Sequence, residues 1–505
     1  MIDLDAPTIT TDIAIIGSGM GGGTLAYALR NRGAKVLIVE RGGYLPREPE
    51  NWSPQEIFVA KRYRTTDPYL DGHGKPFRPS IYHVVGGCTK VYGAALPRFR
   101  REDFGALESE DGVSPVWPIA YDELEPYYAE AERLFRVHGT AGTDPIEGER
   151  STPFPYPAVP HEPVIADVAD NFERQGLRPF PLPLGIDLRE GGTCIRCKTC
   201  DGFPCKVGAK SDAEICVTKP ALESPNVSML TGARAIALRT DPTGRRVTGL
   251  DVDVDGSRRT IIASTYVVAA GAINSATLLL RSASDQHPNG LSNATGLVGR
   301  NYMAHINSAL MAIRPKTNGT VFQKTLALND WYFSESNSRV GMGHAQLLGK
   351  LQASMLQGSV PWAPKRVLAE LAGRSVDWYL MTEDLPDPEN RVSLDPAGNV
   401  IVAYRPNNLA LHKRLLRSMA SAMRRAGYPM IQTRRFGLDA TAHQCGTVRF
   451  GDDPATSVLD PLCRSHDVAN LFVMDASFLP SSSAQNPALT VAAQALRVGE
   501  KAVFN

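Results

Sequence analysis

The sequence predicts an α/β protein with a Rossmann-like first domain, and two strand-to-helix junctions support that prediction. Residues 11–31 read as a short apolar strand, a glycine-rich turn and a helix. Residues 260–280 read as a second β-rich strand that ends at Gly271 and leads into an apolar helix. Strands that alternate with helices in this way are typical of a parallel sheet covered by helices.

The first turn has the G-x-G-x-x-G spacing of a dinucleotide-binding loop. Gly17 permits the tight turn, Gly19 lets a pyrophosphate approach the backbone, and Gly22 lets the helix pack closely on the strand. A second strand over 35–39 ends in Glu40, about 20 residues after the turn, where a carboxylate can bind ribose hydroxyls. This combination predicts a dinucleotide cofactor, although a glycine pattern alone would be weak support.

The turn does not distinguish a nicotinamide from a flavin, but its neighbours favour FAD. Arg41 and two glycines directly follow Glu40, which is the feature that favours the flavin. Residues 227–234 read as a further strand of the same sheet that runs on into Ala235.

Composition excludes several classes of function. The chain has 505 residues, enough for about two to four domain-sized units. Its formal net charge of +1 gives no electrostatic footprint for nucleic acid, so we expect a small-molecule partner. Residues 1–7 lack the features of a signal peptide, and no apolar run is long enough to span a bilayer. The expectation is a cytoplasmic protein with its eight cysteines mostly reduced; its oligomeric state is not indicated.

Prolines and helical periodicity mark the scaffold between the junctions. The proline-rich stretch 151–157, with Pro160 and Pro163 close behind, predicts a domain border near 150–165. Residues 121–138 have apolar side chains at helical spacing and read as a surface helix. Paired glycines in 82–93 predict a backbone that passes close to a flat ligand.

The C-terminal part adds a polar cluster around His443, Asp475 and Asn486. With the N-terminal turn, the Gly86–Thr89 loop, residues 270–276 and residues 290–301, this pattern resembles the glucose-methanol-choline (GMC) family of FAD-dependent alcohol oxidases and dehydrogenases. The resemblance covers nearly the whole chain. It implies a Rossmann-like FAD domain assembled from separated segments and an α+β substrate domain with an antiparallel sheet.

The resemblance also implies domain ranges and site residues. Residues 1–105, 186–307 and 431–505 are assigned to the FAD domain, and residues 106–185 and 308–430 to the substrate domain. The predicted cofactor-binding residues are Gly17, Gly19, Gly22, Glu40, Arg41, Gly86, Gly87, Thr89, Ala235, Gly271, Asp475, Ala476, Asn486, Pro487 and Thr490.

His443 and Asn486 match the family's catalytic positions. Oxidation of an alcohol removes a hydroxyl proton while hydride leaves the carbon for the flavin, so a base that titrates near neutral pH is needed. The hypothesis is that His443 is the base and that Asn486 orients the alcohol oxygen.

Two departures from the family pattern carry information. Val91 occupies the position where members with covalently attached FAD have a histidine, so we expect non-covalent FAD. Tyr92 replaces a frequent asparagine, which puts one flavin contact in doubt. Cys194, Cys197, Cys200 and Cys205 could bind zinc or an iron–sulfur cluster, but they lack the two separated pairs of a zinc ribbon. Free thiols or a local disulfide are the favoured interpretation, with no metal.

The substrate is inferred from one stretch. Residues 86–99 look like the corresponding element of pyranose 2-oxidase and bacterial glycoside 3-oxidases, which favours oxidation of a secondary hydroxyl of a sugar or glycoside to a keto-sugar. Six aromatic residues in the proposed substrate domain could stack on a sugar, although core positions are the more common role of such residues: Trp331, Tyr332, Phe333, Trp362, Trp378 and Tyr379.

Three alternatives remain open at this point. One is an oxidase of primary alcohols, whether aryl, aliphatic or aminoglycoside. A second is a flavoprotein that has lost catalysis. The third passes electrons to a quinone or cytochrome, in which case the basic, apolar stretch 351–371 could touch a membrane surface; a loop and helix over the active site is the favoured interpretation of that stretch. Oxygen or another compound could serve as electron acceptor.

Overall fold

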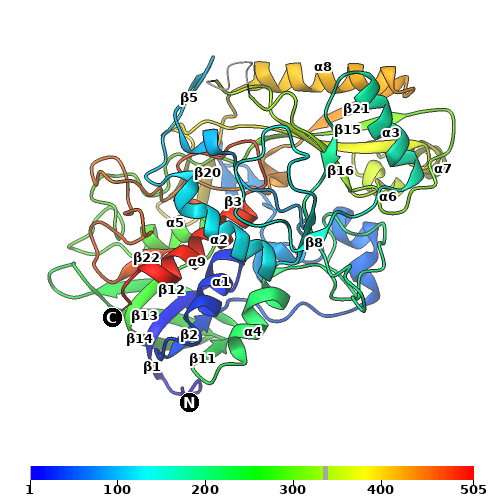
Figure 1. Ribbon diagram of the computed structural model, residues 1–505. Helices are drawn as coiled ribbons and strands as arrows, with labels where there is room; N and C mark the ends of the chain where they lie inside the picture. The colour runs from blue at the N-terminus through cyan, green and yellow to red at the C-terminus, as the bar shows by residue number, and fades with distance from the viewer. Residues whose placement is uncertain (1, 334–338, 505) are drawn as a thin grey trace.

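Two large β-sheets organise the chain in the computed structural model, which describes residues 2–333 and 339–504 (Figure 1). The described part of the first sheet has the strand order β11-β2-β1-β14-β13-β12, with β22 beside the end of β14. Its strands are β1 (Thr8–Ile16), β2 (Val36–Val39), β11 (Val227–Leu230), β12 (Ala233–Thr240), β13 (Val247–Val254), β14 (Ser257–Val268) and β22 (Leu471–Val473).

The centre of the first sheet is parallel, which confirms the Rossmann-like prediction. Strand β1 pairs in parallel with β2 and β14, and β14 pairs in parallel with β22. Residues 13–16 of β1 are all buried, because both faces of the sheet are covered at this point. Helices α1 (Met20–Leu29) and α9 (Ala488–Lys501) pack together against it, so the two ends of the chain share one layer (Figure 1).

The strand expected over 227–235 is in fact two strands. Gly232 has a φ of +67°, and the chain turns there. Strand β11 forms one edge of the first sheet, whereas β12 forms the other edge in an antiparallel hairpin with β13. The prediction of β-structure in residues 227–235 is confirmed, but the left-handed conformation of Gly232 divides the segment into two strands.

The second sheet is antiparallel between all neighbours in its order β21-β15-β18-β17-β16-β9. Its strands are β9 (Phe180–Pro181), β15 (Ile306–Ile313), β16 (Leu326–Leu328), β17 (His344–Leu347), β18 (Ser375–Thr382) and β21 (Met430–Arg435). This is the antiparallel sheet expected of the substrate domain.

Alternating side chains give the second sheet two different faces. One face, with Leu310 and Trp378, packs on helices α3 (Pro163–Arg174) and α8 (Leu409–Arg425). The opposite face presents Ala309, Gln346 and Tyr379 to a cavity. Helices α6 (Ala353–Gln357) and α7 (Lys365–Ala372) cover part of that second face.

Two segments pack across the domain ranges predicted from the sequence. Helix α2 (Tyr121–Leu134) lies in the expected substrate domain, yet its buried face joins the core of the first sheet, where it packs on α9. Residues 431–435 lie in the expected FAD domain, yet they pair with β15 as part of β21. Hydrogen-bond register and apolar packing decide which sheet or core a segment joins, and neither follows from the order of segments along the chain.

Smaller elements complete the fold. The remaining strands are β3 (Tyr69–Asp71), β4 (Pro76–Phe77), β5 (Leu107–Ser109), β6 (Gly112–Ser114), β7 (Val137–Gly139), β8 (Tyr156–Pro157), β10 (Leu184–Gly185), β19 (Arg391–Leu394) and β20 (Val400–Ala403). The remaining helices are α4 (Lys219–Leu222) and α5 (Ala272–Arg281), with short turns at Pro49–Trp52, Gln55–Val59, Gly87–Lys90, Arg101–Phe104, Glu214–Thr218, Leu438–Ala440 and Ala476–Phe478. None of the helices in the described ranges is long and apolar enough to cross a membrane.

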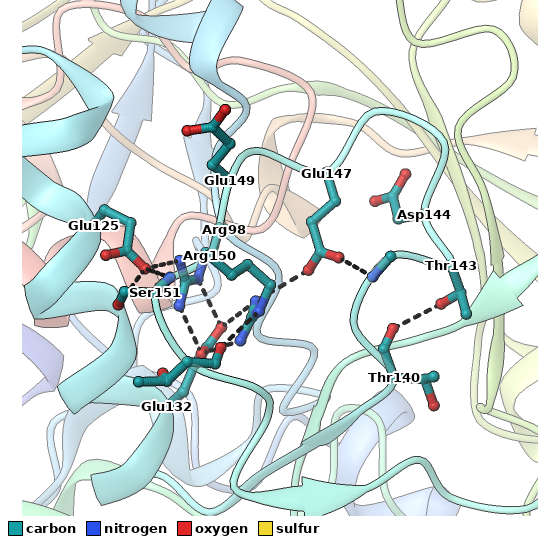
Figure 2. Close-up of polar contacts among 12 residues, drawn as sticks. Arg98, Glu125, Glu132, Thr140, Thr143, Asp144, Glu147, Glu149, Arg150 and Ser151 are labelled. Atoms are coloured by element: carbon teal, nitrogen blue, oxygen red, sulfur yellow. Dashed lines mark hydrogen bonds and ion pairs between the residues drawn. The ribbon is translucent and has the colours of Figure 1, made fainter.

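A buried ionic cluster fastens α2 to the loop that follows it (Figure 2). Arg98 donates two hydrogen bonds to Glu132, both 2.9 Å, and one to Glu125 at 2.8 Å. Arg150 also contacts Glu132 and donates to Glu147 at 3.0 Å. Buried charges require such pairing, because each loses its hydration on folding.

Candidate active site

A cavity of about 1450 Å³ lies where the two sheets meet. The first sheet contributes the glycine-rich turn, Glu40 and Asp475 to its wall, and the second sheet contributes Gln346 and Tyr379. Residues of α6, α7 and the loop between them, including Trp362, also line it, as expected for a segment over the active site.

The glycine-rich turn has the geometry that the sequence predicted. Gly17 has a φ of +111°, which disfavours any side chain. A Cβ at Gly22 would overlap the Gly17 carbonyl oxygen, so this glycine sets the close approach of α1 to β1. A Cβ at Gly19 would meet nothing within 4 Å, because the backbone there faces the open cavity. The turn therefore fits a dinucleotide that lies against its backbone.

Glu40 holds this turn in shape. Its carboxylate accepts hydrogen bonds from Ser18 N at 3.0 Å, Ser18 Oγ at 2.6 Å and Gly42 N at 2.9 Å. Burial raises the pKa of Glu40, and these three donors oppose that shift. The residue lines the cavity, where its remaining lone pairs can accept ribose hydroxyls.

Asp475 organises the second junction in the same manner. It accepts hydrogen bonds from Gly271 N and Ser477 N, each at 2.9 Å, and from the Ser275 hydroxyl. Gly271 has a φ of +86° and faces open space, so a ligand can approach its backbone as well.

Most of the predicted site residues line the cavity, and three do not. Those that line it are Gly17, Gly19, Glu40, Arg41, Gly87, Thr89, Ala235, Gly271, His443, Asp475, Ala476, Asn486 and Pro487. Gly22, Gly86 and Thr490 lie behind this surface. The Thr490 hydroxyl is 2.8 Å from the Tyr128 hydroxyl, so it joins α9 to α2 rather than contacting a ligand.

His443 belongs to a chain of hydrogen bonds that fixes its tautomer. His305 Nε2 lies 2.8 Å from the Ser482 carbonyl oxygen, which only accepts, so this nitrogen carries a proton. Neutral His305 therefore accepts at Nδ1, and His443 Nδ1 donates to it at 2.9 Å. The remaining nitrogen, His443 Nε2, is unprotonated and accepts from Asn486 Nδ2, which is 3.3 Å away.

Both histidines are held neutral. Burial lowers the pKa of His305 to about 4. The pKa of His443 lies well below its usual value, first because of burial and then because of repulsion from His305 and Lys324. His443 is thus a proton acceptor at neutral pH, as its predicted role requires.

The sequence analysis missed His305. The residue has a φ of 52°, in the left-handed region, and follows the family-like stretch that ends at Asn301. No periodicity or spacing linked it to His443, because only the fold brings residues 305 and 443 together.

Gln346 lines the cavity and lies against a buried histidine, His344. Burial lowers the pKa of neighbouring His344 to about 3, so His344 is neutral and carries one ring proton. His344 Nδ1 lies 2.7 Å from Asn329 Oδ1, and His344 Nε2 lies 3.2 Å from Gln346 Oε1. The Gln346 side chain is thus held between His344 and the cavity that it lines.

The four cysteines from 194 to 205 are free thiols in the structure. Within residues 2–333 and 339–504, no group of three or more His, Cys, Asp or Glu side chains has a metal-binding arrangement. Lys210 Nζ donates to the carbonyls of Cys200 at 2.8 Å and Phe203 at 2.7 Å, so a buried ammonium clamps this loop. Lys198, Asp201 and Phe203 line the cavity.

The aromatic residues divide between the core and the cavity. Tyr379 and Trp362 line the cavity, and the Tyr379 ring lies 6.2 Å from that of His443. Trp378 is buried against α3 and α8, and Tyr332 donates to Asp103 at 3.0 Å. Trp331 and Phe333 are not among the described residues that line the cavity.

Comparison with known proteins identifies the class to which this site belongs. Family models described as GMC oxidoreductase match residues 75–307 and 386–495, and an NAD(P)-binding Rossmann-like domain matches residues 15–45. The chain belongs to the GMC oxidoreductase family, whose members act on alcohol groups with FAD.

Its relatives cover nearly the whole chain. Paromamine 6'-oxidase of Streptomyces fradiae is 31% identical over 96% of this chain and 90% of its own. Fructose dehydrogenase large subunit of Gluconobacter japonicus is 28% identical over 99% of this chain and 98% of its own. The crystal structure of pyridoxine 4-oxidase from Mesorbium loti superposes with a TM-score of 0.67 at 20% identity, covering 97% of this chain and 99% of the other.

The described residues fit the FAD that the family implies. The cavity is large, two glycine turns open onto it, and Asn486 Oδ1 is buried without a partner among the described residues. A buried oxygen without a partner calls for a donor from a bound group.

Proposed function

We propose that the protein oxidises a hydroxyl group of a sugar-class substrate, either a sugar or a glycoside, with His443 as the base and Asn486 as the residue that orients the alcohol. The observation that carries the proposal is the His305–His443–Asn486 chain, which ends in an unprotonated nitrogen at the cavity.

In this mechanism His443 Nε2 accepts the hydroxyl proton of the substrate. FAD, when bound, supplies the acceptor for the hydride that leaves the carbon. The charged imidazole then keeps its Nδ1–H bond to His305, whose Nε2–H donates to the Ser482 carbonyl. Because that carbonyl dipole lies at the end of the chain, it stabilises the positive charge that develops on the histidine pair. Asn486 Nδ2 lies within reach of His443 Nε2 and so is suited to donate to the substrate oxygen.

The sugar class is supported by the cavity wall. Gln346, Asp201 and Lys324 give the cavity wall both hydrogen-bond donors and acceptors. Tyr379 adds an aromatic ring beside His443. Several relatives bear names of sugar-class oxidoreductases, among them fructose dehydrogenase large subunit and paromamine 6'-oxidase. The reacting group predicted from residues 86–99 is a secondary hydroxyl. The aminoglycoside oxidases among the relatives favour a second candidate, a hydroxyl of an aminoglycoside.

The test is an anaerobic titration of the purified holoenzyme with sugars, glycosides, an aminoglycoside and simple alcohols, followed by flavin absorbance. We expect a sugar-class compound to bleach the flavin bands, and product analysis to separate a ketone from an aldehyde. His443→Ala should retain FAD and lose bleaching by on the order of 10²- to 10⁴-fold in rate. Near-normal bleaching in His443→Ala would refute the base, and bleaching by simple alcohols alone would refute the sugar class.

The second part of the proposal is that FAD is held without a covalent bond. Val91 lines the cavity and has no nucleophilic atom. Acid precipitation of the holoenzyme should leave all flavin in the supernatant. Flavin that stays with the pellet would contradict this assignment.

A further inference from the structure

We propose that Asp201 and Lys324 form a diol-binding pair in the active-site cavity, which takes two neighbouring hydroxyls of the substrate. This inference rests on the proposed function and assigns a substrate-recognition role to the cysteine-bearing segment.

The two side chains meet at the cavity wall from distant parts of the chain. Lys324 Nζ contacts Asp201 Oδ1, and both residues line the cavity together with His443. The Lys324 side chain is only 2% exposed and that of Asp201 19%. Repulsion from Lys324 contributes to the lowered pKa of His443, which lines the same cavity.

The carboxylate is held in place before any substrate arrives. Asp201 Oδ2 accepts from Gly349 N, which connects it to the second sheet. The next residue, Gly202, donates its N–H to the Val91 carbonyl at 2.9 Å. This hydrogen bond connects the loop to the glycine-containing stretch 82–93. With the Lys210 clamp described above, these contacts fix the loop between Cys200 and Cys205 as a rigid wall.

The pair still has unused hydrogen-bonding capacity. An ammonium has three donors, and among the described residues Lys324 Nζ contacts only Asp201. A buried ammonium with unmet donors is costly unless oxygen ligands reach it. Each carboxylate oxygen of Asp201 accepts one hydrogen bond and has a second lone pair free.

An adjacent acceptor and donor match two neighbouring hydroxyls. One hydroxyl donates to Asp201 while the next accepts from Lys324. Because the pair has no net charge, it needs no charged group on the substrate. Gly93 provides the room: a Cβ there would overlap both Asp201 Oδ1 and Lys324 Nζ.

The experiment measures binding of a methyl glycoside and its monodeoxy analogues by titration calorimetry, with the flavin of the holoenzyme reduced beforehand so that no turnover occurs. In the wild type, removal of either of two neighbouring hydroxyls should weaken binding by about 10-fold or more, as expected for hydrogen bonds to charged groups. Asp201→Asn and Lys324→Met should each bind the parent glycoside more weakly and lose the discrimination against one analogue. Lys198→Met is the matched control, because Lys198 lines the same cavity without a contact to the pair.

Gly93→Ala is the third variant, since it displaces the pair without removing either charge. It should also lose the discrimination. Equal discrimination in the wild type and all three pair variants would overturn the diol site. That result is distinguishable from failure of the proposed function, which is measured by flavin bleaching in the wild type rather than by analogue binding.

Discussion

At the scale of single residues, the behaviour of His443 is set by its neighbours. Its Nδ1 proton is committed to His305, which leaves Nε2 as the only acceptor. The motif around His443 predicts that its imidazole is the base, but it does not indicate which ring nitrogen accepts the proton. His305, which decides that, is 138 residues away in sequence.

The first prediction concerns the pH dependence of kcat/KM. His443 works as a base only when neutral, so activity falls when the pH drops below its pKa. Because burial, His305 and Lys324 lower that pKa, the acid limb should lie well below pH 6.5, the ordinary histidine value. Lys324→Met removes one cationic neighbour and should move the limb to higher pH. A limb at or above pH 6.5 in the wild type would contradict this account.

The second prediction concerns His305 as a positioning residue. His305→Leu removes the acceptor for His443 Nδ1–H, so both tautomers of His443 become accessible. We expect kcat to fall by on the order of 10²-fold, at the low end of what a general base contributes. His305→Gln can accept from His443 and donate to Ser482, so it should restore much of kcat. If His305 had a purely structural role, kcat would fall equally in both variants, together with their thermal stability.

At the scale of elements, the turn between β1 and α1 separates ligand binding from folding. Gly19 has a φ of −71°, which any residue adopts, and its Cβ position is open. Gly22 has no such room, because a Cβ there would overlap the Gly17 carbonyl. The same motif thus contains one glycine that faces open space, where we propose that the cofactor lies, and one that allows close packing of α1 on β1.

The third prediction uses these two glycines as a matched pair. Gly19→Ala should leave the unfolding free energy of the apoprotein within about 0.5 kcal/mol of the wild type while weakening FAD retention. Gly22→Ala should destabilise the apoprotein by about 1–3 kcal/mol, because α1 must move off β1. Denaturant unfolding and flavin-release measurements would check both. Full FAD retention by Gly19→Ala would argue against a cofactor at this turn.

At the scale of the whole molecule, a buried ionic cluster holds distant segments together. Arg98 lies in the stretch whose resemblance suggested a sugar oxidase, yet it is buried in the ionic cluster that joins α2 to the loop after it (Figure 2). That stretch contributes residues 87–89 and 91–95 to the cavity, and its arginine to the scaffold.

The fourth prediction compares Arg98 with its exposed neighbour Arg101. Arg98→Met leaves Glu132 and Glu125 buried with less compensation and should cost about 3–5 kcal/mol of unfolding free energy. Arg101→Met removes a pair with Asp122 whose side chains are 43% and 66% exposed, and should cost about 1 kcal/mol or less. Denaturant unfolding of the two variants checks this, and equal losses would show that Arg98 in the cluster contributes no more stability than the exposed pair.

The sequence by itself determined the features that depend on neighbouring residues. The glycine turn and the junction at Gly271 were predicted from the residues, because close packing and positive φ angles leave local signatures in residue type. The antiparallel substrate sheet was predicted through the family resemblance. Only the tertiary structure decided the site's chemistry. It broke 227–235 into two strands, moved α2 into the first core and withdrew Thr490 from the cavity. It also joined His305 to His443 and Asp201 to Lys324, contacts between residues more than 100 positions apart that arise from the meeting of two sheets, which no local pattern encodes.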